Sequence, residues 1–162
     1  PDALRLCKLC EELDIDFIEE PLHYNEPRNL AHLRSQTRIR VAAAENEHYK
    51  VRDYIEAGAI DFIQPNINND GGLTASLRIA AQAKAYNVPL SHGNGNGPHN
   101  IALHAGVLNG GLVEYHFHKW MAYNALFEKV PQPDNGWLDV SQEPGFGLEP
   151  KDGIIKEYKR NT

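Results

Sequence analysis

Five polar residues, each placed after a short apolar stretch, recur at nearly equal intervals along the chain. They are Glu19, Glu45, Asn66, His92 and Glu114, and the intervals between them are 26, 21, 26 and 22 residues. Each interval has the length of one strand, loop and helix, and such alternation predicts an α/β fold with a parallel sheet. Parallel strands end at one edge, so the five side chains are expected to meet at one mouth, where barrel and open α/β enzymes place their chemistry.

Hydrophobic pattern and turn residues place the expected elements. The predicted strands cover residues 15–18, 39–44, 62–66, 88–91 and 112–115, and the predicted helices cover 2–13, 26–35, 47–57, 73–86 and 100–108. Gly58 is the expected C-terminal cap of its helix, and Thr74 is the expected N-terminal cap of the helix over 73–86. Beyond Trp120 the chain is rich in Pro and Gly, and we expect loops and short extended segments there.

Composition limits the classes of protein and partner. The chain has 162 residues, a net charge of -6 and 41% hydrophobic residues, which fits one globular domain or part of a larger one. The acidic balance argues against nucleic acid as a partner, and no apolar stretch reaches the 18 residues or so that a membrane span needs. Cys7 and Cys10 form a lone C-x-x-C that we interpret as two helix residues rather than a zinc or redox site. Unpaired thiols favour a reducing, cytoplasmic location.

An ordered set of motifs accompanies the expected strand ends. The motifs are Phe17-Ile18-Glu19-Glu20-Pro21, Ala44-Glu45-Asn46, Gln64-Pro65-Asn66 with Gly71-Gly72-Leu73-Thr74, Ser91-His92-Gly93, and Val113-Glu114. In this order they resemble the enolase superfamily, mandelate racemase/muconate lactonizing enzyme family. The tail motifs Gly136-Trp137-Leu138 and Pro144-Gly145-Phe146-Gly147-Leu148 resemble the C-terminal end of its acid-sugar dehydratases.

The resemblance implies a modified TIM barrel, (β/α)₇β, with a capping domain. Residues 1–120 resemble the fourth to eighth barrel strands, and residues 121–162 resemble the tail that packs on the cap. The family's metal carboxylate on the third strand and its lysine motif on the second strand have no counterpart in this sequence. We therefore expect the chain to be one piece of a longer polypeptide, or to pair with another chain, and to be inactive alone.

The same resemblance implies roles for the strand-end residues. Glu19 and Glu45 match Mg²⁺ ligands, and hard carboxylate oxygens suit that ion. His92 matches the catalytic histidine, and Glu114 matches the acid that hydrogen-bonds the substrate's carboxylate or enediolate oxygen. Asn66 stands where the family usually has the Asp that holds this histidine. An amide can fix the histidine tautomer but lacks the negative charge that stabilises imidazolium, so His92 is expected to be a weaker base.

Three further side chains near these positions have open roles. Asp70 is an alternative carboxylate partner for His92. His48, three residues beyond Glu45, and His23, which follows Glu19-Glu20-Pro21-Leu22, are candidate substrate-binding residues, although each could equally be a surface histidine.

The implied reaction is a Mg²⁺-dependent dehydration of an acid sugar such as an aldonate. It removes the proton α to a carboxylate and eliminates the β-hydroxyl, with a small-molecule carboxylate as substrate and a homo-oligomer as the intact enzyme. A racemase or epimerase of the same superfamily is the alternative within the family. A non-catalytic half-barrel that serves as a scaffold is the alternative of another class, because Asn66 and the missing third ligand also fit it.

Overall fold

A three-stranded parallel sheet forms the centre of the fold in this computed structural model, which describes residues 1–91 and 97–159. The strands are β1 (Phe17–Glu19), β2 (Arg40–Ala43) and β3 (Phe62–Ile63), in the order β1-β2-β3. The register aligns Ile18 with Val41 and Ala43 with Ile63. Three of the five predicted strands are therefore confirmed, and among the described residues β1 has a sheet neighbour on one side only, as expected.

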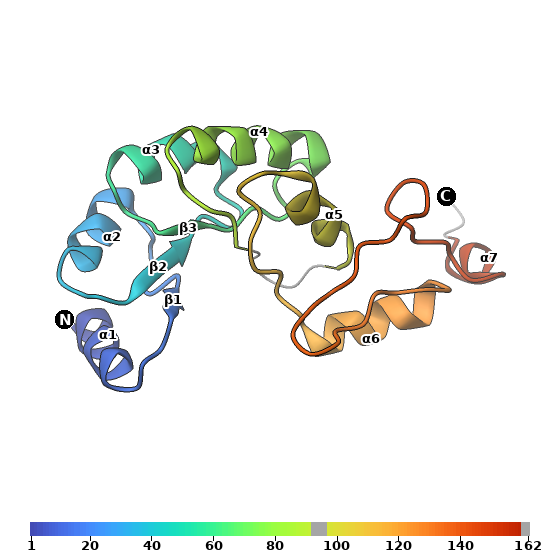
Figure 1. The fold of residues 1–162 in the computed structure, drawn as a ribbon, viewed down its shortest axis with the longest axis horizontal. Helices are drawn as coiled ribbons and strands as arrows, with labels where there is room; N and C mark the ends of the chain where they lie inside the picture. Colours follow the sequence, from blue (N-terminus) through green and yellow to red (C-terminus); the bar gives the residue numbers. More distant parts are fainter. Residues whose placement is uncertain (92–96, 160–162) are drawn as a thin grey trace.

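One helix precedes the first strand, and helices follow each of the three strands (Figure 1). They are α1 (Asp2–Glu12), α2 (Pro27–Arg34), the 3₁₀ turn η1 (His48–Lys50) with α3 (Val51–Glu56), and α4 (Gly72–Ala85). The buried core contains apolar side chains from each of α2, α3 and α4 and from the strands, among them Leu30, Val41, Tyr54, Ile63 and Ala83. Burying each of the larger aliphatic side chains, such as Leu30, Val41 and Ile63, contributes about 1.5–3 kcal/mol, and this packing fixes the strand ends that carry the candidate site.

The two predicted helix caps have different outcomes. Gly58 adopts a φ of +64° just after α3, where its N–H donates to Ile55 O and the N–H of Ala59 donates to Tyr54 O, which is the pattern of a Schellman cap. The cap at Thr74 was wrong. Helix α4 already begins at Gly72, and its N-cap is Gly71 with a φ of +85°, because the two glycines allow the left-handed turn earlier in the chain.

The segment 88–91 forms less regular structure than predicted. It lies parallel to β3 through a single bridge between Ile63 and Leu90, with Ile63 N bonded to Pro89 O at 3.1 Å and Ser91 N bonded to Ile63 O at 2.9 Å. Pro89 has no N–H to extend the ladder, so residues 88–91 continue the sheet without forming a full strand.

The strand predicted over 112–115 was wrong, because residues 110–116 are irregular. The chain nevertheless comes alongside the preceding segment, where Leu90 N donates to Asn109 O at 2.8 Å. Gly111 is required here, since a Cβ at this position would lie 2.4 Å from the carbonyl oxygen of Leu90. The single hydrogen bond between Leu90 and Asn109 places residues 110–116 beside residue 90, but it does not form a ladder of strand hydrogen bonds.

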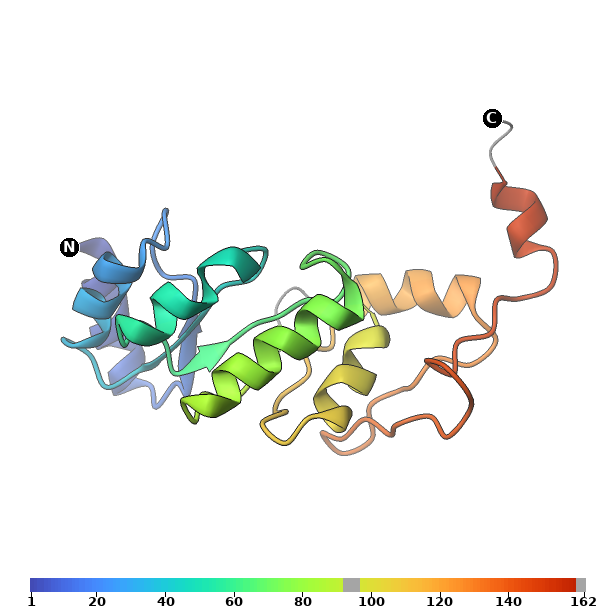
Figure 2. The same ribbon diagram turned by 90° about the horizontal axis from the view of Figure 1, so that it is seen from above.

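The C-terminal region contains two helices that the sequence pattern did not predict. After α5 (His99–Gly106), which was predicted, come α6 (Phe117–Leu126) and the short α7 (Ile154–Tyr158). Trp120 on α6 is fully buried, and its indole N–H donates to Pro131 O at 2.7 Å, which anchors the Pro-rich tail. Figure 2 shows the tail extending away from the sheet, with the two termini at opposite ends of the molecule. Across residues 1–91 and 97–159, no helix is long and apolar enough to cross a membrane.

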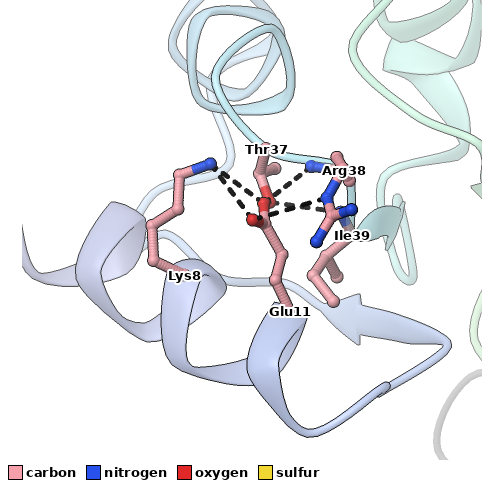
Figure 3. Close-up of polar contacts among 5 residues, drawn as sticks. All are labelled: Lys8, Glu11, Thr37, Arg38 and Ile39. Atoms are coloured by element: carbon pink, nitrogen blue, oxygen red, sulfur yellow. Dashed lines mark hydrogen bonds and ion pairs between the residues drawn. The ribbon is translucent and has the colours of Figure 1, made fainter.

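A carboxylate on α1 ties this helix to the turn before β2 (Figure 3). Glu11 Oε1 accepts hydrogen bonds from Thr37 Oγ1 at 2.6 Å and from the backbone N–H of Arg38 at 2.8 Å. Lys8 Nζ lies 3.1 Å from the same oxygen, and the Arg38 guanidinium lies 3.7 Å from Oε2. The bond from Thr37, followed by those from Arg38 and Lys8, lowers the pKa of Glu11 from 4.5 to about 2.

We expect Glu11→Gln to remove a pH-dependent part of the stability. The folded pKa lies below the unfolded one, so the ionised carboxylate stabilises the fold fully above pH 4.5, and this stabilisation is lost as the pH falls towards 2. The variant should be less stable than wild type at neutral pH and should converge with it near pH 2, as measured by denaturant unfolding across this range. The matched control is Glu12→Gln on the exposed side of α1. A constant difference at all pH values would contradict the proposed origin of the effect.

Candidate active site

Two carboxylates stand at the ends of neighbouring strands. Glu19 is the last residue of β1, and Glu45 follows β2 by two residues. Burial, followed by the nearby Glu114, raises the pKa of Glu19, while the side-chain amide of Gln64 hydrogen-bonds the carboxylate and lowers it; Glu45 contributes a further raising effect. Glu19, Glu45 and Glu114 are thus close enough to interact electrostatically, although they are 26 and 69 residues apart in the chain.

The backbone turns sharply beside both of these carboxylates. The backbone φ values of Glu20, Ala44 and Asn46 are +41°, +81° and +61°. These lie in the left-handed region that residues other than glycine rarely adopt. Ala44 is also buried, at 2% exposure. Residues held in such conformations cost about 1–3 kcal/mol each and cluster at functional sites, so the strained turns mark the ends of β1 and β2 as a site candidate.

Asn66 links the third strand end to the second. Its side chain is fully buried, and its amide Nδ2 donates to Glu45 Oε1 at 2.8 Å. Its Oδ1 accepts the backbone N–H of Asn68 at 3.1 Å and lies 3.4 Å from Asn100 Nδ2. The carboxylate of Glu45 is therefore held in place by an uncharged donor, which an Asp at position 66 could not provide in its ionised form.

Glu114 reaches this region from the irregular segment that follows α5. It is partly buried, and its electrostatic effect on Glu19 places the two carboxylates near each other. Its Oε2 is buried and has no hydrogen-bond partner in the described part of the chain. A buried carboxylate oxygen without a donor is costly unless a cation or another donor compensates it, so this atom is available to a ligand.

The donor chemistry of the carboxylates of Glu19 and Glu45 fits a hard divalent cation. Their oxygens are the ligands that Mg²⁺ prefers, and their mutual repulsion calls for a positive charge between them. Within residues 1–91 and 97–159, however, no three His, Cys, Asp or Glu side chains are grouped closely enough to form a complete metal site by themselves. The chain therefore supplies a partial ligand set, and the roles of Glu19 and Glu45 as ligands stay predictions.

The histidines predicted for this site lie in three different situations. His48, at the start of η1, has its Nδ1 3.5 Å from Oδ1 of Asp70, which is fully buried. His23 instead packs edge-on against Tyr24, with ring centroids 4.5 Å apart, and lines a hollow beside α1 and α2. His92 lies outside the described residues, so its predicted catalytic role stays untested. The geometry thus brings His48 towards the loop of Asn66 and Asp70 but places His23 elsewhere.

Two buried amides that belong to the site were not singled out by the sequence pattern. Gln64 is 1% exposed and hydrogen-bonds Glu19. Asn100, at the start of α5, is fully buried, and its Oδ1 accepts the backbone N–H of Ile67 at 3.0 Å. Gln64 belongs to the Gln64-Pro65-Asn66 motif, and its place in that motif is the sequence signal that could have identified it as a site residue. Nothing in the local sequence pattern indicated Asn100.

The chain belongs to the enolase C-terminal domain-like family, whose model matches residues 1–154. This result confirms the family that the ordered motifs indicated, and the mixed α/β chain with its parallel sheet matches the family's C-terminal barrel domain. Structural comparison agrees: the L-talarate dehydratase from Polaromonas sp. JS666, solved with Mg and L-glucarate, superimposes with a TM-score of 0.86 at 28% identity over 99% of this chain and 44% of that one.

Curated relatives of this chain are acid-sugar dehydratases. It is 30% identical to the arabinonate dehydratase of Saccharolobus solfataricus over 98% of this chain and 44% of that protein. It is 27% identical to the D-gluconate dehydratase of Thermoproteus tenax over 97% of this chain and 33% of that protein. The chain thus spans less than half the length of these relatives.

Proposed function

We propose that this chain is the C-terminal part of a Mg²⁺-dependent acid-sugar dehydratase. The observation that carries the proposal is that Glu19, at the end of β1, feels the charges of Glu45, just after β2, and of Glu114, on the irregular segment after α5, while the buried amides of Gln64 and Asn66 contact Glu19 and Glu45. The dehydratase relatives support the reaction class. The L-talarate dehydratase solved with Mg and L-glucarate supports the metal and a carboxylate-bearing substrate.

In this proposal each residue has a separate task. Glu19 and Glu45 hold Mg²⁺ together with ligands from the rest of the enzyme, and Asn66 orients Glu45. When bound, the metal would act as a Lewis acid that lowers the cost of charge on the substrate carboxylate. Glu114, in its protonated form, donates a hydrogen bond to a carboxylate oxygen of the substrate. A base from the rest of the enzyme takes the α-proton, and His92 donates a proton to the β-hydroxyl as the C–O bond breaks, so that this group leaves as water.

The parts of the enzyme have proposed positions as well. Residues 1–120 form the second half of an enolase-type barrel, and residues 121–162 pack against its capping domain. The intact enzyme is a cytoplasmic homo-oligomer that binds neither nucleic acid nor membranes. The chain's coverage of 44% of the arabinonate dehydratase is consistent with this division.

The rival activity within the superfamily is racemisation or epimerisation, which shares the loss of the α-proton. The two reactions are separated by incubating the complete enzyme with aldonates and Mg²⁺ in deuterated water and following the mixture by NMR. A dehydratase produces 2-keto-3-deoxy acids. A racemase exchanges the α-proton for deuterium without forming them, and that result would replace the proposed function.

The scaffold alternative is tested by the metal. A non-catalytic half-barrel has no need to bind Mg²⁺, so a complete protein with Glu19 and Glu45 intact that fails to bind the ion in calorimetric titration would favour the scaffold. Saturable binding of about one Mg²⁺ ion per subunit would instead support the proposal that the protein is an enzyme.

A further inference from the structure

Asp70 is a buried carboxylate, and one of its two oxygens accepts a hydrogen bond from the backbone. Its side chain is fully buried, and its Oδ2 accepts the backbone N–H of Asn66 at 2.7 Å. Burial raises the pKa of Asp70, while the backbone hydrogen bond from Asn66 and the nearby His48 act in the opposite direction. Asp70 therefore anchors the loop that follows β3 through the backbone of Asn66.

The second oxygen of Asp70 faces His48. Oδ1 is buried without a hydrogen-bond partner among the described residues, and the nearest charged or imidazole partner is His48 Nδ1 at 3.5 Å. An unbonded buried carboxylate oxygen is costly, and a small movement of the imidazole would satisfy it. The distance is slightly long for a hydrogen bond, as acid–base contacts often are before a ligand binds.

His48 presents the rest of its ring to solvent. Its side chain is 47% exposed, and its ring meets Tyr49 edge-on with the centroids 5.7 Å apart. With Nδ1 directed to Asp70, Nε2 is left for another partner. His48 contacts Asp70, Asp70 bonds the backbone of Asn66, and Asn66 bonds Glu45, so the imidazole is connected to Glu45 by three successive contacts.

We propose that Asp70 is a positioning residue that holds His48 at the rim of the active site, where Nε2 of His48 hydrogen-bonds a hydroxyl group of the acid-sugar substrate. This inference rests on the proposed function and adds a specificity residue to it. Asp70 fixes the Nδ1–H tautomer, so that the Nε2 lone pair accepts the substrate's O–H. The substrate class is accordingly a polyhydroxylated acid with a hydroxyl beyond the two reacting carbons.

The test uses the complete enzyme with His48→Ala, Asp70→Asn and the double variant. Each single change should lower kcat/KM for the preferred acid sugar by about tenfold, the worth of one hydrogen bond. The double variant should lose no more than His48→Ala alone, because Asp70 acts through His48. On a deoxy analogue without the contacted hydroxyl, wild type and His48→Ala should be equal. The control is His32→Ala, an exposed histidine on α2.

Additive losses in the double variant would overturn the positioning role, and an unchanged kcat/KM in His48→Ala would overturn the substrate contact. His48→Ala alters an exposed side chain, so it remains informative if Asp70→Asn fails to fold. Ring nitrogen NMR of His48 gives a readout independent of turnover: the Nδ1–H tautomer should dominate in wild type and lose its dominance in Asp70→Asn. If no acid sugar is dehydrated, the proposed function fails, whereas this NMR result still decides whether Asp70 holds His48.

Discussion

Glu45→Gln in the complete enzyme is expected to weaken Mg²⁺ binding and to lower dehydratase activity by about 100-fold or more. Substituting residues that merely support metal ligands already costs about 10–100-fold, and this change removes the charge of a direct ligand. The fold should be little affected, because Glu45 is only partly buried and glutamine keeps its shape and a carbonyl oxygen.

Calorimetric titration with Mg²⁺ and steady-state kinetics measure the two effects of Glu45→Gln. The matched control is Glu56→Gln, an exposed glutamate at the end of α3 that pairs with Arg52 at 2.6 Å. Unchanged affinity in Glu45→Gln would mean that Glu45 is not a ligand. An equal loss in Glu56→Gln would show that the effect is not specific to the site.

Asn66→Ala is expected to lower the free energy of unfolding by about 3 kcal/mol. Asn66 is fully buried and bonds Glu45, Asn68 and Asn100 at 2.8–3.4 Å, so its loss leaves the buried amide of Asn100 and the partly buried carboxylate of Glu45 without this partner and also opens a cavity. The same change should weaken Mg²⁺ binding, because Glu45 loses the donor that orients it.

Denaturant unfolding measures the stability effect of Asn66→Ala, with Asn69→Ala as the control. Asn69 is exposed in the same loop, and a substitution there should change stability by less than about 0.5 kcal/mol. If the two alanine variants prove equally stable, the network around Asn66 contributes nothing measurable, and its role in orienting Glu45 would have to be abandoned.

The predictable part of the fold is the part with strong alternation. The elements from α1 to α4 were predicted because each apolar strand ends at turn residues and is followed by a helix with apolar spacing. The strand expected at 112–115 failed because a ladder depends on a partner, and the one bond from Leu90 to Asn109 is not enough. Helix α6 was missed because it depends on tertiary packing, which the local sequence pattern does not show. Trp120 on this helix is buried against a Pro-rich tail whose composition suggests loops.

The site divides in a similar way. The strand ends that carry Glu19 and Glu45 follow from the parallel topology, so their placement at one edge of the sheet could be predicted from the sequence. Glu114 lies on an irregular segment, so its position near Glu19 does not follow from a strand end. The detailed partners could not be predicted, because they depend on the register of the loops. Asp70 and Asn66 were both considered as partners of His92, which lies outside the described residues, so these pairings stay predictions. The contacts that the structure gives them are with His48 for Asp70 and with Glu45 for the amide of Asn66.

The most direct test of the central claim is metal add-back during turnover. The complete enzyme is treated with EDTA, desalted and incubated with a panel of aldonates and aldarates, with and without Mg²⁺, and 2-keto-3-deoxy products are quantified. Dehydration of at least one acid sugar that disappears without Mg²⁺ and returns on its addition is the predicted result. No product from any acid sugar in the presence of Mg²⁺, or equal product without it, would contradict the account.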